Sequence, residues 1–99
     1  GDWQVSGIVN EDEETFMCKY KTFIGDEIEI VLPKNGKITE CENEIGKIYN
    51  ENGKWKLKLY KIVTKNNKEL KEVHSGNLNP IRLPCKLPYL TFLRKEEKG

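Results

Sequence analysis

The side chains that could do chemistry in this sequence are few and widely spaced. Three cysteines, Cys18, Cys41 and Cys85, accompany a single histidine, His74. A structural zinc site would need all four to converge, because the cysteines lack the C-x-x-C spacing that such sites use. The pattern favours three small buried thiols in a reducing compartment. The alternative is one disulfide with a spare thiol.

Catalytic chemistry has little support in the sequence. His74 lies beside Ser75-Gly76 in a predicted turn, which is typical of a surface histidine. The acidic run 11–14 lacks the loop glycine and the bidentate closing carboxylate of a calcium site. The motifs G-x-S-x-G and H-E-x-x-H and the glycine-rich phosphate loops are absent. The sequence therefore predicts a protein that is not an enzyme, with no catalytic residues, no metal site and no cofactor.

A row of lysines on one face of a predicted hairpin is the strongest candidate for a binding surface. Basic side chains interleaved with aromatic ones are typical of surfaces that follow a nucleic-acid backbone. The alternative is that Glu27 and Glu29, on an adjacent strand, neutralise the row by cross-strand pairing. The candidate binding residues are Tyr49, Lys54, Lys56, Lys58 and Tyr60.

The hairpin that carries this row is the clearest local signal. Asn52 and Gly53 both tolerate positive φ, so they can form the two-residue type I′ turn that closes a hairpin. The register then sets Glu51 opposite Lys54, and a slip by one residue would expose the whole apolar face. That apolar face consists of Ile48, Trp55, Leu57 and Leu59.

Other segments also favour strands. Apolar and polar residues alternate with a period of two over 14–23 and 26–32, and the chain contains no alanine, the best helix former. Prolines at 80, 84 and 88 predict an extended strap packed over the sheet. A last strand is expected over 89–93, followed by a frayed tail over Arg94–Gly99.

The predicted fold is therefore all-β. We expect a single domain over residues 1–99, built as a small curled sheet or an SH3-like barrel of five to six short strands with a proline-rich strap. The net charge is +1, but residues 1–53 carry twelve acidic and five basic side chains, and residues 54–99 carry four and twelve. The longest apolar stretch is too short for a transmembrane helix, so no membrane span is expected.

Three segments occur in succession along the chain: "FIGDEIEIVLP", "ENEIGKIYNENGKWKLKLYKIV" and "KELKEVHSGNLNPIRLPCKL". Together they resemble the core of a bromo-adjacent homology (BAH) domain, a chromatin module. The opening "DWQV" is similar to the start of members found in replication-origin and silencing proteins. The resemblance implies a non-enzymatic nuclear protein that docks on a histone, a nucleosome or a silencing or replication partner.

Two other function classes fit the residues. The first is a secreted or cell-surface β-sandwich or lipocalin-like binding domain, which one disulfide would favour and three free thiols would disfavour. The second is a single-stranded nucleic-acid-binding barrel, whose affinity would fall steeply with salt. A protein partner is expected, nucleic acid is a further candidate partner, and the sequence predicts no oligomeric state.

Overall fold

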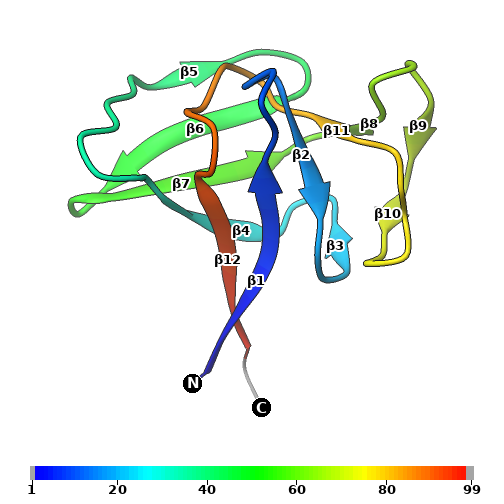
Figure 1. Ribbon diagram of the computed structural model, residues 1–99, viewed down its shortest axis with the longest axis horizontal. Coiled ribbons are helices and arrows are strands. Elements are labelled where there is room, and N and C mark those ends of the chain that lie inside the picture. Colours follow the sequence, from blue (N-terminus) through cyan, green and yellow to red (C-terminus); the bar gives the residue numbers. More distant parts are fainter. Residues whose placement is uncertain (1, 98–99) are drawn as a thin grey trace.

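The computed structural model describes residues 2–97, which form twelve strands and no helix (Figure 1). The all-β prediction is confirmed. No helix long and apolar enough to cross a membrane occurs within these residues. The first six strands are β1 (Asp2–Val9), β2 (Thr15–Cys18), β3 (Thr22–Phe23), β4 (Glu27–Val31), β5 (Cys41–Glu42) and β6 (Gly46–Glu51). The others are β7 (Lys54–Leu59), β8 (Ile62–Val63), β9 (Glu69–Leu70), β10 (Glu72–Val73), β11 (Ile81–Arg82) and β12 (Phe92–Glu97).

Eight of these strands form one curled antiparallel sheet, in the order β11-β2-β1-β12-β4-β7-β6-β5. Two small ribbons, β3 with β10 and β8 with β9, lie beside it and give the molecule the shape of a half-barrel (Figure 1). The strand number exceeds the predicted five to six because six strands are only two residues long. Such short strands show no alternation that a sequence could reveal.

The core lies on the concave side of the sheet. Alternate residues of each strand face inward, as Ile28 and Ile30 do on β4 and Leu57 and Leu59 do on β7. Half-buried side chains, Trp55 among them, pack around the edge of the same cluster. The other fully packed residues are Val9, Phe16, Cys18, Ile48, Ile62, Val73, Ile81, Leu83, Leu87 and Leu93.

The predicted hairpin register is confirmed along β6 and β7. Glu51 pairs with Lys54, and Asn52 and Gly53 take φ values of 54° and 83°, as a type I′ turn requires. The strand bends directly after Leu59, where the N–H groups of Tyr60 and Lys61 both donate to the carbonyl of Ile45. The bend returns the next apolar residue, Ile62, to the core.

The proline-rich strap crosses the sheet as an extended segment. Its backbone is fixed by hydrogen bonds from Leu83 N–H to the Glu14 carbonyl (2.9 Å) and from Leu87 N–H to the Glu13 carbonyl (3.0 Å). The buried side chains of Leu83 and Leu87 account for the apolar content of the strap.

The predicted frayed tail is wrong for most of its length. Arg94–Glu97 belongs to β12 and pairs with β1, from Val5 opposite Arg94 to Asp2 opposite Glu97. The charged residues of this segment, such as Arg94 and Lys95, suggested a tail, but a two-stranded ribbon that extends into solvent also carries charged side chains. Lys98 and Gly99 lie outside the described residues.

Candidate functional site

The predicted lysine row lies on the convex, solvent-facing side of the sheet. Lys56 on β7 is flanked by Glu29 on β4 and by Tyr49 on β6, directly opposite on each side. Lys58 is flanked in the same way by Glu27 and Lys47. Because residues directly opposite share a face, the sheet brings four of the five predicted residues together. They are Tyr49, Lys54, Lys56 and Lys58.

Two of the three lysines of this row form ion pairs with acids. Lys54 Nζ lies 3.7 Å from Glu29 Oε1, and Lys56 Nζ lies 3.3 Å from Glu51 Oε1. This is the cross-strand neutralisation that the sequence left open as an alternative. Acids thus offset the charge of Lys54 and Lys56, whereas Lys58 forms no ion pair in the part of the chain that the structure describes.

The two tyrosines of the prediction also bind carboxylates. The Tyr49 hydroxyl donates to Glu27 Oε1 (3.2 Å), and its partial burial together with this bond raises the pKa of Tyr49 to about 12. Tyr60 follows β7, and its hydroxyl donates to Glu42 of β5, which raises the pKa of Tyr60. Both phenols are hydrogen-bond donors committed to acids of the sheet.

The buried carboxylate of Glu29 lies on the same face and contacts both Arg94 and Lys54. The sequence predicted it only as a neighbour of the lysine row. Glu29 is 8% exposed, accepts a hydrogen bond from Nε of Arg94 (2.6 Å) and forms an ion pair with Nη2 of the same guanidinium, in addition to facing Lys54. The Arg94 guanidinium in turn stacks on the Trp3 ring, 4.1 Å from its centroid. The sequence had given Arg94 to a tail, so its pairing with β4 could not be seen.

A polar hollow of about 500 Å³ opens beside Trp3. Lys95 lines it, with its Nζ 2.8 Å from Asp26 Oδ2 and 2.8 Å from the Lys21 carbonyl. The same ammonium lies 5.6 Å from the Tyr20 ring centroid and 5.7 Å from that of Phe23. These contacts anchor the β12 end of the ribbon to the body of the domain.

Residues 61–82, which we call the basic lobe, carry positive charge that is less well matched. They contain four lysines and one arginine against two glutamates. Ile62 pairs with Leu70 in the β8–β9 ribbon; Lys61 directly precedes β8 and Lys71 directly follows β9. In the part of the chain that the structure describes, neither of them forms an ion pair, and nor does Lys68.

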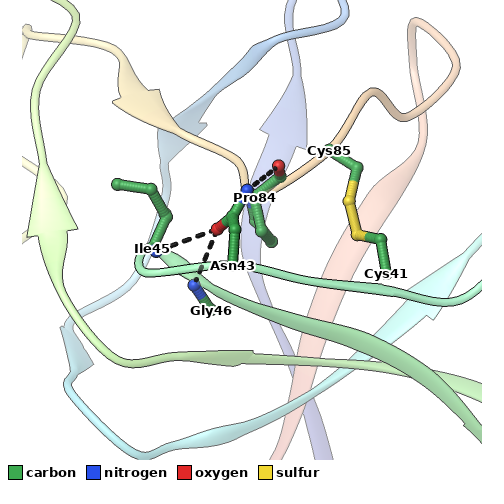
Figure 2. Close-up of a disulfide and its surroundings, with 6 residues drawn as sticks. All are labelled: Cys41, Asn43, Ile45, Gly46, Pro84 and Cys85. Atoms are coloured by element: carbon green, nitrogen blue, oxygen red, sulfur yellow. Dashed lines mark hydrogen bonds between the residues drawn. A yellow bond between two sulfur atoms is a disulfide. The ribbon is translucent and has the colours of Figure 1, made fainter.

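The cysteines differ from the preferred prediction. Cys41 of β5 and Cys85 of the strap form a disulfide with a Cα–Cα distance of 6.7 Å, while Cys18 is free and buried (Figure 2). Burial raises the pKa of the Cys18 thiol. The prediction of three free thiols is therefore wrong. The sequence could not show the pairing because the two cysteines are 44 residues apart and leave no local pattern. The structure matches the alternative of one disulfide with a spare thiol.

An asparagine reinforces the link between β5 and the strap. The side-chain amide of Asn43 donates to the Pro84 carbonyl (2.6 Å), next to the disulfide (Figure 2). Its Oδ1 accepts from the N–H groups of Ile45 (2.9 Å) and Gly46 (3.4 Å). The strap is thus joined to the sheet edge by a covalent bond and by a hydrogen-bonded side chain.

The acidic run 11–14 is a structural turn. Asp12 Oδ1 accepts from the N–H groups of Glu14 (2.9 Å) and Thr15 (3.0 Å), and Lys65 Nζ lies 3.1 Å from Oδ2. Burial opposes ionisation, but these bonds together lower the pKa of Asp12 to about 2. Within residues 2–97 no group of three or more potential ligands is arranged to hold a metal ion.

The fold and these surfaces define the class of this chain as a small all-β domain with a curled antiparallel sheet and a disulfide-tied strap. It is 49% identical over 96 residues to the "tRNA hydroxylation protein P" of Helicobacter pylori strain 26695, and 48% identical to that of strain J99. Each match covers 97% of this chain and 23% of the relative, so the chain spans about a quarter of the length of these relatives. No protein-family model matches the chain, and no solved structure is significantly similar to it.

These relatives overturn several predictions. The resemblance to a bromo-adjacent homology domain is wrong, and with it the chromatin role, the histone partner and the nuclear location, because the relatives are bacterial proteins named for tRNA. The disulfide meets the criterion set for the secreted β-sandwich, but neither that class nor the single-stranded nucleic-acid barrel fits the name of the relatives. The motifs behind the resemblance, an Asn-Gly hairpin and alternating strands, are common to small β domains of many kinds.

Proposed function

We propose that this chain is an accessory domain of a larger bacterial protein that takes part in tRNA hydroxylation in the cytoplasm. The observation that carries the proposal is the 49% identity to tRNA hydroxylation protein P along 97% of the chain. Because the chain spans only 23% of that relative, the larger protein would hold the reaction centre elsewhere.

The chemistry of the described side chains favours an accessory role over a catalytic one. His74 is exposed and lies 3.7 Å from the exposed Glu72. Two cysteines are bonded to each other, and Cys18 is buried in the core with its thiol pKa raised. Asp12, whose pKa is lowered, and Glu29, which is buried, are both held by structural hydrogen bonds. None of these groups is poised as a general base or nucleophile.

We further propose that the domain contacts the phosphate backbone of folded tRNA through the basic lobe. Among the described residues, Lys61, Lys68 and Lys71 form no ion pair, so the domain itself does not neutralise these three charges. A polyanion supplies a counter-charge, and binding it releases condensed cations. The lysine row on β7, by contrast, already has acidic neighbours.

The test uses the full-length protein that contains this chain and two matched triple variants. One replaces Lys61, Lys68 and Lys71 with Gln, and the other replaces Lys54, Lys56 and Lys58 with Gln. Both remove three positive charges. Affinity for tRNA is measured against salt concentration, and hydroxylated nucleosides are measured by mass spectrometry of tRNA from cells that depend on each variant.

The lobe variant should bind tRNA at least about tenfold more weakly, with the slope of log affinity against log salt reduced by about two to three. It should also lower tRNA hydroxylation, whereas the β7 variant should change affinity by less than about twofold. If the β7 variant loses affinity and the lobe variant does not, the contact belongs to the row predicted from sequence. If deletion of the whole domain leaves both tRNA affinity and hydroxylation intact, the accessory role is wrong.

A further inference from the structure

The ends of the described chain meet on one two-stranded ribbon. Asp2 of β1 pairs with Glu97 of β12, and both strands run side by side to the bottom of the molecule (Figure 1). β2 pairs with β1 only from Gly7 onward, and β4 pairs with β12 only as far as Arg94. Beyond these points, no further strand of residues 2–97 pairs with the ribbon on either side.

The solvent-facing side of this ribbon carries exposed apolar side chains beside two charged ones, Arg94 opposite Val5 and Glu96 opposite Trp3. Trp3 is 41% exposed and Val5 is 47% exposed on β1, and Phe92 is 45% exposed on β12. The register places Val5 opposite Arg94, which is two residues from Phe92, so the three side chains share one face. Half-buried Ile8 lies directly opposite Phe92 and extends this apolar surface toward the sheet.

The orientation of this surface is fixed. The Arg94 guanidinium holds the Trp3 ring from one side and is itself held by the buried Glu29. A bulge between Val5 and Gly7 shifts the register where the ribbon leaves the sheet. Neighbouring apolar side chains held in one arrangement on an exposed face are typical of a surface that another protein part covers.

We propose that this surface, formed by Trp3, Val5 and Phe92, docks against another domain of the same larger protein. A segment joined to either end of the described chain starts at the same place, because Asp2 and Glu97 are paired. The relatives, of which this chain spans 23%, contain ample chain to supply such a domain. A tethered domain attached next to an apolar surface meets it at high effective concentration.

The occupant should be an apolar surface with polar groups at one border. The polar hollow beside Trp3, which contains both acids and lysines, borders the patch on one side. An amphipathic protein surface matches this combination, whereas an RNA backbone does not match an apolar face. The proposal rests on the proposed function only in taking this chain as part of a longer protein.

Hydroxyl-radical footprinting of the full-length protein tests the docking without tRNA and without any activity assay. Oxidation rates of Trp3 and Phe92 are compared with that of Tyr60, which is similarly exposed at 38% but lies outside the ribbon, with its hydroxyl bonded to Glu42 of the outermost strand β5. After correction for intrinsic reactivity, Trp3 and Phe92 should react at least about fivefold more slowly than Tyr60. Equal corrected rates overturn the proposal.

Variants sharpen the result. Val5→Lys places a charge at the centre of the patch and should raise the oxidation rates of Trp3 and Phe92 toward that of Tyr60. Leu78→Lys is the matched control. Leu78 is 85% exposed in the loop between β10 and β11, outside the ribbon, so this substitution should leave the protection unchanged. Protection that disappears on dilution indicates a second copy, and protection that needs tRNA indicates RNA; either outcome overturns the proposal. The lobe variant separates the two proposals. If it loses tRNA hydroxylation while Trp3 and Phe92 stay protected, the tRNA contact and the docking of the ribbon are independent of each other.

Discussion

At the scale of single residues, carboxylates hold the backbone and the charged side chains of this domain in place. Asp12 closes the turn between β1 and β2 by accepting two backbone N–H bonds and an ion pair with Lys65. Glu29 accepts a hydrogen bond from Arg94 and forms an ion pair with it on the convex face. Both residues join distant parts of the chain: Asp12 and Lys65 are 53 positions apart, and Glu29 and Arg94 are 65 positions apart.

Asp12→Asn should lower the free energy of unfolding at pH 7 by about 1–2 kcal/mol. The folded-state pKa of Asp12 is about 2 against an ordinary value of 3.8, so ionised Asp12 stabilises the fold above about pH 4. This stabilisation disappears as the pH falls from about 4 to about 2. Urea unfolding at pH 7 and pH 2.5 should therefore show a smaller pH effect in the variant, with Glu11→Gln as the control one residue away. An identical pH dependence in Asp12→Asn and the unmodified protein would contradict this assignment.

At the scale of elements, β4, β7 and β6 are held in register by matched charges as well as by the core. Lys54 lies opposite Glu51 and also faces Glu29, so a carboxylate at position 54 would meet two like charges. Lys54→Glu should lower stability by roughly 0.5–1 kcal/mol, and adding Glu51→Lys should restore part of it. A double-mutant cycle by urea unfolding measures this coupling, with Lys34→Glu in an exposed turn as the control. Additive effects would show that the two side chains do not interact.

The disulfide fixes a second pair of elements, the edge strand β5 and the strap. Replacing Cys41 and Cys85 with Ser should lower stability by about 4 kcal/mol in the chain-entropy estimate for a separation of 44 residues. The melting temperature of the unmodified protein should fall in dithiothreitol, while that of the double-Ser variant should not respond. A reductant effect of equal size in both proteins would mean that the disulfide is not its cause.

At the scale of the whole molecule, the sequence revealed what is local and missed what is distant. The β6–β7 hairpin, its turn and its buried face were predictable because Asn52-Gly53 and the alternation of apolar residues lie within eighteen positions of each other. The pairing of β1 with β12 joins the two ends of the chain, and no periodicity reports such a partner. The lysine row was found, but the ion pairs of Lys54 with Glu29 and of Lys56 with Glu51 depend on the packing of neighbouring strands. The basic lobe was missed because its lysines do not share one strand.

The order of the strands also affects how readily this domain aggregates at high protein concentration. Its two outermost strands, β5 and β11, are each only two residues long, so little unpaired backbone is offered to a neighbouring molecule. Directly behind β5 lies β6, a six-residue strand whose outer hydrogen-bonding edge would be an open template for aggregation. The Cys41–Cys85 bond and Asn43 keep β5 and the strap together at that edge. Cutting the disulfide would therefore threaten solubility before it threatened the core, with edge-to-edge association as the first sign of damage.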